Sequence, residues 1–247
     1  ALGDNTEGEY NAAFGYNALR KNTTADNNAA FGYYALACNT TGTNNVAVGH
    51  CALKANTTAG VNVAVGKSAM LVNTTGAENV AFGNSLEANT TGSCNSALGN
   101  GSLQANTTGS YNTGAGRFAL KKNTTANNNT AVGMCSLFDN TTGGNTVAVG
   151  FQSLMNQTTG DSNIGIGERA GCGLTTANGN ILIGQGIGQA TITGHCNVGV
   201  GYQGFVSLTS GGCNVAMGYR PLYSNTTGDI NVAIGRCALH SNTTADS

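Results

Sequence analysis

The chain has 247 residues, of which only 9% are charged, and its formal net charge is −1. This composition excludes the basic surface that nucleic acids and anionic membranes attract, and the apolar stretches are far too short to span a bilayer. We therefore expect no nucleic-acid partner and no membrane insertion. Val, Ile, Leu and Phe nevertheless recur at even spacing, which indicates an ordered chain.

A glycine returns every seventeen residues, with one sixteen-residue step between Gly83 and Gly99. We call these residues the repeat glycines; they are Gly15, Gly32, Gly49, Gly66, Gly83, Gly99, Gly116, Gly133, Gly150, Gly167, Gly184, Gly201, Gly218 and Gly235. A fixed period of this length is typical of stacked structural repeats. We predict a single array of coils over residues 1–247, without atypical end units, that forms part of a longer fibre.

Each repeat glycine follows a short apolar run such as Val46-Ala47-Val48. The outer residues are mostly β-branched and the middle residue is small, with Leu182 as the exception, which predicts a strand. Because both strand faces are apolar, we expect one to fill the coil and the other to need a partner. An Ala-Leu pair such as Ala52-Leu53 then predicts a second strand that buries its Leu, and Asn-Thr-Thr-Gly predicts the return turn. The fold class is all-β, a parallel β-solenoid or β-roll of about fourteen 17-residue coils.

An asparagine stands four residues before nearly every repeat glycine, and Thr146 is the one departure. Such regularity at a polar position predicts that equivalent amides stack on neighbouring coils. We call these residues the ladder asparagines; they are Asn11, Asn28, Asn45, Asn62, Asn79, Asn95, Asn112, Asn129, Asn163, Asn180, Asn197, Asn214 and Asn231.

Two groups of proteins share the motif that runs from Asn45 to Leu53 and equivalent positions. The Asn-x-Ala-x-Gly-x-x-Ala-Leu core resembles the head repeats of trimeric autotransporter adhesins, although the coils here are longer. With the added Asn-Thr-Thr-Gly, the units are similar to repeats in tail fibres and related surface proteins of phages and large viruses. The resemblance covers the full chain. It implies a left-handed β-roll, packing of three chains, an extracellular cell or virion surface, and a role in adhesion or host attachment.

Ten units carry Asn-Thr-Thr, and its asparagine, which we call the turn asparagine, makes each of them a formal N-glycosylation acceptor. Structural stacking in the turn is the favoured interpretation and glycosylation the alternative, because glycans on every coil would crowd one another. The acceptors are Asn22, Asn39, Asn56, Asn73, Asn89, Asn106, Asn123, Asn140, Asn225 and Asn242, and Asn156 is an irregular eleventh.

Cysteine and tyrosine columns supply the remaining candidate sites. Of the eight cysteines, Cys196 and Cys213 occupy the same position in adjacent coils, about 4.8 Å apart, and are the one candidate intrachain disulfide. Tyrosines at equivalent positions on neighbouring coils either stack for stability or form platforms for sugar rings; these are Tyr16, Tyr33, Tyr202 and Tyr219.

The segment from Gln157 to Ser210 lacks Asn-Thr-Thr, and we expect it to present a different outer face. No residues form a catalytic triad, a metal site or a phosphate loop, so we predict neither an enzyme nor a cofactor. We expect a structural extracellular or virion-surface fibre that self-associates as a homotrimer or filament. The alternatives are an adhesin module that binds host or matrix glycan and, further off, an ice-binding solenoid.

Overall fold

The computed structural model describes residues 1–246, which contain strands and no helix, in two compact units, Ala1–Thr125 and Ala126–Ser247. The strands of unit 1 are β1 (Ala12–Phe14), β2 (Ala29–Phe31), β3 (Val46–Val48), β4 (Val63–Val65), β5 (Val80–Phe82), β6 (Ser96–Leu98) and β7 (Thr113–Ala115). Those of unit 2 are β8 (Thr130–Val132), β9 (Val147–Val149), β10 (Ile164–Ile166), β11 (Ile181–Ile183), β12 (Val198–Tyr202), β13 (Val215–Tyr219) and β14 (Val232–Ile234).

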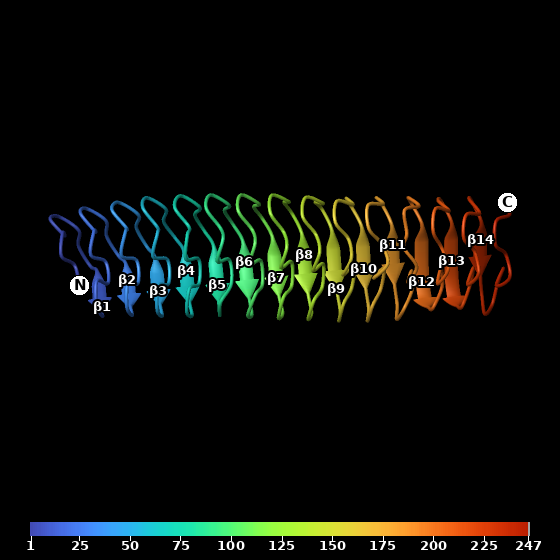
Figure 1. Cartoon of the computed structure of the whole chain (residues 1–247), viewed down its shortest axis with the longest axis horizontal. Coiled ribbons are helices and arrows are strands. Elements are labelled where there is room, and N and C mark those ends of the chain that lie inside the picture. The colour runs from blue at the N-terminus through green and yellow to red at the C-terminus, as the bar shows by residue number, and fades with distance from the viewer. Residues whose placement is uncertain (247) are drawn as a thin grey trace. The chain divides into compact units, whose positions relative to one another are not determined.

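Within each unit, successive strands pair in parallel, each residue with its equivalent in the next coil (Figure 1). Val46 pairs with Val63, for example. The short repeat keeps this register, because Leu86 takes up the buried corner position only three residues after its repeat glycine. The predicted parallel β-solenoid is therefore confirmed.

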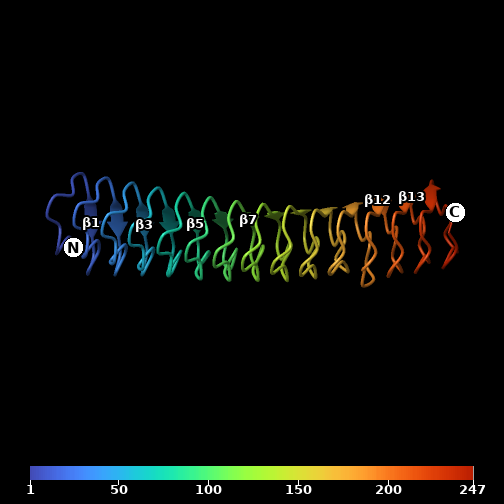
Figure 2. The same ribbon diagram turned by 90° about the horizontal axis from the view of Figure 1, so that it is seen from above.

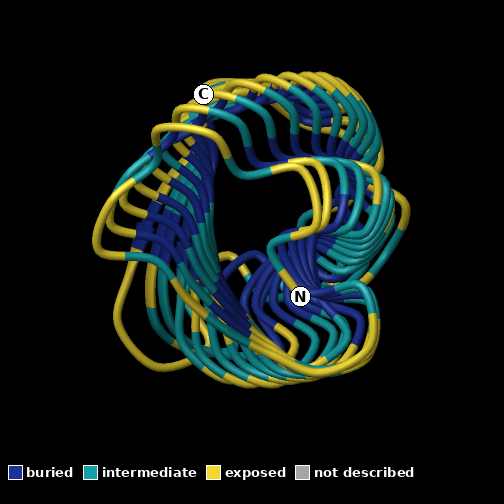
Figure 3. Ribbon diagram, turned by 90° about the vertical axis from the view of Figure 1, so that its left-hand side faces the viewer, coloured by how far each residue is buried: buried dark blue, intermediate teal, exposed yellow. Residues whose placement is uncertain are grey.

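The structure settles which strand face fills the coil. The small middle residue points inward, so that Ala47 is fully buried while Val48 is 38% exposed. Figure 3 shows buried residues lining the inside of the coils. The interior is already occupied, since a Cβ added to Gly165 would lie 2.6 Å from Leu154 Cγ. Only Ala or Gly fits at most of these positions, and the larger strand residues are left on the outside.

The prediction of a second strand at Ala-Leu is wrong. Each described coil has one strand, and the strands follow one another along one side of the coils (Figure 2). The Ala-Leu segment is a turn, and both Ala52 and Leu53 are fully buried. Leu53 adopts a left-handed conformation with φ of 49°. This conformation costs a non-glycine residue about 1–2 kcal/mol. Burial of a leucine side chain contributes about 1.5–3 kcal/mol, so the corner is stable because its leucine reaches the interior.

The repeat glycines meet two requirements at once. Gly218 has a φ of 129°, which side chains disfavour, and a Cβ there would lie 2.6 Å from Gly235 O. We predicted that glycine ends Asn-Thr-Thr-Gly because the turn needs a positive φ, but the structure gives a different reason. Gly92, for example, lacks a positive φ, but a Cβ would lie 2.6 Å from Asn89 Oδ1, so close packing favours a small residue.

Gly218→Ala and Gly235→Ala separate these two requirements. Gly235 has a similar φ of 122°, but a methyl group added there would have no atom within 4 Å. We expect Gly235→Ala to cost about 1–2 kcal/mol from backbone strain alone, and Gly218→Ala to cost clearly more because the methyl group also strikes the next coil. Urea unfolding followed by circular dichroism measures both. Equal losses would contradict the steric role of coil-to-coil contact.

Candidate functional site

The ladder asparagines cross-link neighbouring coils from the inside. Asn45 donates its backbone N–H to Asn28 Oδ1 over 2.9 Å, and its Nδ2 donates to the same oxygen over 3.1 Å and to Ala59 O over 2.9 Å. Both asparagines are buried. Equivalent bonds recur in unit 2, where Asn214 donates to Asn197. These side chains therefore hold the stack together and face no ligand.

The turn asparagines form a second internal ladder. Asn39 Nδ2 donates to Asn22 Oδ1 over 3.0 Å and to Gly42 O over 2.9 Å. Gly42 O also accepts from the ladder asparagine of its own coil, Asn28, over 2.9 Å. In both ladders the amide donates to the preceding coil. The two columns thus meet at one carbonyl in each coil and satisfy buried groups that would otherwise cost about 1–3 kcal/mol each.

Burial of the turn asparagines corrects the glycosylation alternative. A glycan attaches to Nδ2, and this atom in Asn56 already donates to Asn39 Oδ1 and Ala59 O. Nine of the ten regular acceptors are fully buried in the folded coils: Asn22, Asn39, Asn56, Asn73, Asn89, Asn106, Asn123, Asn140 and Asn225. Asn156 and Asn242 are half-buried. The turn asparagines therefore act as structural residues wherever the coil is folded.

One coil in unit 2 departs from both ladders at once. Thr146 replaces its ladder asparagine and Gln157 replaces its turn asparagine. Gln157 Nε2 donates to Thr146 Oγ1 over 3.2 Å and to Gly160 O over 2.8 Å, while Gln157 Oε1 accepts from Asn163 over 3.1 Å. The longer glutamine fills the space left by the shorter threonine. Threonine has one side-chain heavy atom fewer than asparagine and glutamine has one more, so the pair keeps the interior filled and bonded.

The segment from 157 to 210 differs inside the coils, which corrects our expectation of a distinct outer face. Its next three coils replace the turn asparagine by an apolar residue, and Leu174, Ile192 and Leu208 are all buried. Leu174 and Ile192 form an isolated parallel bridge. Here apolar packing replaces the column of turn asparagines, while the ladder asparagines Asn180, Asn197 and Asn214 continue.

Large and small residues compensate within this apolar core. The left-handed corner that leucine holds in the other coils, except for Met70 in one, is Gly171, Gly188 and Phe205 in these coils. Leu182, the one large inward strand residue, fills the space beside the two glycines, because a Cβ on Gly188 would lie 3.0 Å from Leu182 Cδ1. The irregular residues of this segment are therefore explained by repacking of the core.

In the tyrosine columns, the aromatic rings of neighbouring coils stack face to face. The rings of Tyr16 and Tyr33 stack with centroids 5.5 Å apart, and Tyr33 stacks on His50 at 5.1 Å. Tyr202 and Tyr219 stack at 5.3 Å. Both faces of Tyr33 are therefore covered, and partial burial raises its pKa above the ordinary tyrosine value. The arrangement fits stabilising stacks better than sugar platforms, which need an open ring face.

The disulfide prediction for Cys196 and Cys213 is wrong, since both are free, exposed thiols. Their φ values, 58° and 56°, show that the two residues have the same backbone orientation. In-register coils keep such Cβ atoms about as far apart as the coils, about 4.8 Å. A disulfide needs Cβ atoms roughly 3.5–4.5 Å apart. Equivalent positions on parallel rungs therefore do not favour a bridge.

The two threonines of each Asn-Thr-Thr have different environments. Thr40 Oγ1 donates to Thr57 O over 3.0 Å, and this first threonine repeats the same bond from coil to coil. The second threonine, such as Thr41 or Thr58, is exposed. The turn therefore presents one column of outward hydroxyl groups in each unit.

Most of the exposed apolar side chains lie on the outer side of the strands, which we call the strand face. Phe31 is 44% exposed, Val48 38% and Phe82 43%. All the exposed large hydrophobic residues except Val72 and Leu239 lie in a strand, just before a ladder asparagine or just after a repeat glycine. Seven strands at about 4.8 Å and three residues each at about 3.3 Å give the strand face of each unit an area of roughly 330 Å². An exposed apolar patch of a few hundred Å² is often functional.

Residues 1–246 form no pocket, and they contain no group of three His, Cys, Asp or Glu arranged to hold a metal ion. None of the described segments is a helix of the length and apolarity needed to cross a bilayer. Comparison with protein-family models, curated proteins and solved structures returns no match. The strand face is therefore the candidate functional site.

The substitutions Thr146→Asn and Gln157→Asn test whether the longer Gln157 compensates for the shorter Thr146. Each single change should destabilise unit 2, because Thr146→Asn overfills the space beside Gln157 and Gln157→Asn leaves a gap there. The double variant recreates a regular coil and should recover stability, with a coupling energy of about 1–3 kcal/mol. Denaturant unfolding measures the cycle, and Asn45→Thr with Asn56→Gln is the matched reverse exchange in unit 1. Additive losses would contradict the compensation.

Expression with a secretory leader in a glycosylating eukaryotic cell tests the buried acceptors. We expect Asn56 and Asn73 to remain unmodified in folded protein, and glycan to be confined to the half-buried Asn156 and Asn242. Peptide mass spectrometry after deglycosylation in heavy-oxygen water measures the occupancy. Asn156→Gln is the control that should remove one glycan. A folded, fully occupied Asn56 would show that the inner ladder is dispensable.

Proposed function

We propose that this chain is a structural fibre segment whose copies associate laterally through the strand face. The observation that carries the proposal is the continuous apolar surface on strands that are cross-linked from within. A strand with apolar residues on both sides is normally covered on both sides, and the coil covers only one of them. A second copy supplies a surface of the same length and the same coil spacing.

The interior supports a mechanical role. Two amide ladders, buried leucine corners and continuous backbone pairing join each coil to its neighbours, so bending or sliding a coil breaks several bonds at once. The described residues form no pocket, which favours display and assembly over catalysis. By resemblance to tail-fibre and adhesin repeats, we place the segment in the shaft or attachment region of an extracellular or virion-surface appendage.

The tyrosine columns and the threonine column do not favour a second function. Each of these tyrosines has a ring face stacked on a neighbouring ring, and Tyr33 has rings on both faces, which fits stabilising stacks better than sugar platforms. Ice-binding surfaces present flat, regularly spaced hydroxyl groups, whereas one of the two threonines in each turn is tied to a backbone carbonyl. Both alternatives therefore rank below the fibre.

Sedimentation velocity of the full chain across micromolar concentrations tests the proposal. We expect oligomers, and we expect Phe31→Thr, Val48→Thr and Phe82→Thr together to weaken association at least tenfold while the coils stay folded, because threonine keeps the strand preference. The control is Thr41→Ala, Thr58→Ala and Thr75→Ala, which alters the exposed hydroxyl column by the same number of residues. A monomer at every concentration would overturn the proposed function.

A further inference from the structure

The strand face has two edges that carry opposite charge. One edge, the post-glycine edge, consists of the two residues after each repeat glycine. It carries one acidic residue, Glu168, against five basic ones: Lys67, Arg117, Arg169, Arg220 and Arg236. The other edge, the pre-ladder edge, consists of the two residues before each ladder position and has no Lys or Arg. It holds Glu9, Asp26, Glu78, Asp161 and Asp229.

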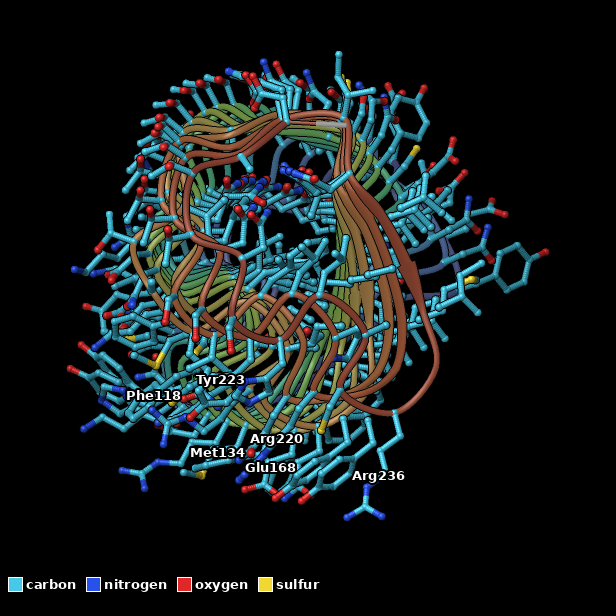
Figure 4. The ribbon with its side chains drawn as sticks, turned by 90° about the vertical axis from the view of Figure 1, so that its right-hand side faces the viewer. Phe118, Met134, Glu168, Arg220, Tyr223 and Arg236 are labelled. Atoms are coloured by element: carbon cyan, nitrogen blue, oxygen red, sulfur yellow. The ribbon has the colours of Figure 1, made fainter. Side chains whose placement is uncertain are left out.

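Both edges are held in place by the structure. In unit 2, the Arg220 guanidinium lies over the ring of Tyr219 at 5.4 Å and its Nε donates to Gln203 Oε1 over 2.9 Å. Arg220 and Arg236 project outward from the post-glycine edge (Figure 4). On the opposite edge, Asp229 Oδ1 accepts the backbone N–H of Gly212 over 2.6 Å. Each carboxylate keeps further lone pairs for a partner.

Unit 1 shows the same segregation. Arg117 lies over the ring of Phe118 at 4.5 Å, and Lys67 follows its repeat glycine four coils into the chain. On the pre-ladder edge, Asp26 Oδ1 accepts the backbone N–H of Glu9 over 2.7 Å, and Glu78 is exposed. The strands of both units therefore run from an acidic edge to a basic edge.

This segregation fixes how a second copy fits. When two strand faces meet by rotation about the stacking axis, the coils of both copies progress in the same direction and each basic edge lies over an acidic edge. When they meet by rotation about the strand direction, the coils progress in opposite directions and like edges meet. Like charges across an interface suppress that arrangement. The first arrangement satisfies both edges.

We propose that the strand face takes a second copy of this chain in the same orientation, with the post-glycine edge of one copy on the pre-ladder edge of the other. The inference rests on the proposed function and adds the direction of assembly. It also assigns a role to charges that the core does not use. The same pairing holds for any number of copies related by rotation about the stacking axis.

Carbodiimide cross-linking of a mixture of isotope-labelled and unlabelled full chains tests the orientation. Carbodiimide joins a lysine directly to a touching carboxylate, and Lys67 is the lysine of the post-glycine edge. We expect mixed-isotope links from Lys67 to Glu78, which is on the opposite edge and lies within one coil of Lys67 along the stacking axis. Links from Lys67 to Glu168, or assembly without any mixed link to the pre-ladder edge, would overturn the inference and leave the fibre proposal standing.

Salt and charge reversal supply an independent readout. Attraction between opposite edges means that association should weaken severalfold between about 20 and 150 mM NaCl, over which the screening length falls to about 8 Å. Lys67→Glu with Arg117→Glu should weaken association about tenfold at low salt, whereas Arg20→Glu with Lys21→Glu, which changes net charge equally but lies off this edge, should not. Association that strengthens with salt would show like edges in contact. A monomer would overturn both proposals together.

Discussion

The buried asparagine amide is the interaction on which the rest of the structure depends. A coil of this length has little apolar interior, and its turns leave backbone carbonyls facing inward. Two amides per coil satisfy those carbonyls and bond to the amides of the preceding coil, as Asn28 and Asn39 do at Gly42. An unmet buried amide costs about 1–3 kcal/mol, so every coil needs a neighbour in register. The strict period, the small inward strand residue and the outward display of valine and phenylalanine follow from that arrangement.

The irregular coils show what the interior requires. Thr146 and Gln157 break both ladders yet preserve volume and bonding within one coil. Further along, Leu174, Ile192 and Leu208 exchange the amide column for apolar packing. The interior therefore tolerates polar or apolar contents as long as the space is filled and each buried donor has an acceptor. The outer face keeps its character throughout, which is the behaviour expected of a surface used for assembly.

The period, the strand before each repeat glycine and the stacking of equivalent residues were readable from the sequence because nearly every unit repeats them, whereas the same pattern wrongly predicted a second strand at Ala-Leu. The sequence indicated only in part which strand face points inward. The small middle residue of each strand was the signal, but it identifies the inner face only when Leu53 and its equivalents are known to fill the coil. The left-handed leucine corner had no signal, because leucine rarely adopts positive φ. The sequence alone could not distinguish a buried, structural Asn56 from a glycosylated one, because Asn-Thr-Thr is compatible with both. The failed disulfide shows that Cα spacing without Cβ direction is insufficient.

The one-way donation of the amides has an electrical consequence for each unit. Backbone bonds between coils run both ways, since Ala29 N donates to the following coil and Gly32 N to the preceding one, and their dipoles largely cancel. The stacked side-chain amides do not cancel one another, because each points an N–H towards the N-terminal coil, and the smaller hydroxyl dipole of the first threonine in each turn, such as Thr40, opposes them only in part. The amide dipoles add along the unit, as peptide dipoles add along a helix. The N-terminal end of a unit thus offers hydrogen-bond donors and partial positive charge, the C-terminal end offers acceptors and partial negative charge, and coils add favourably in one sense only.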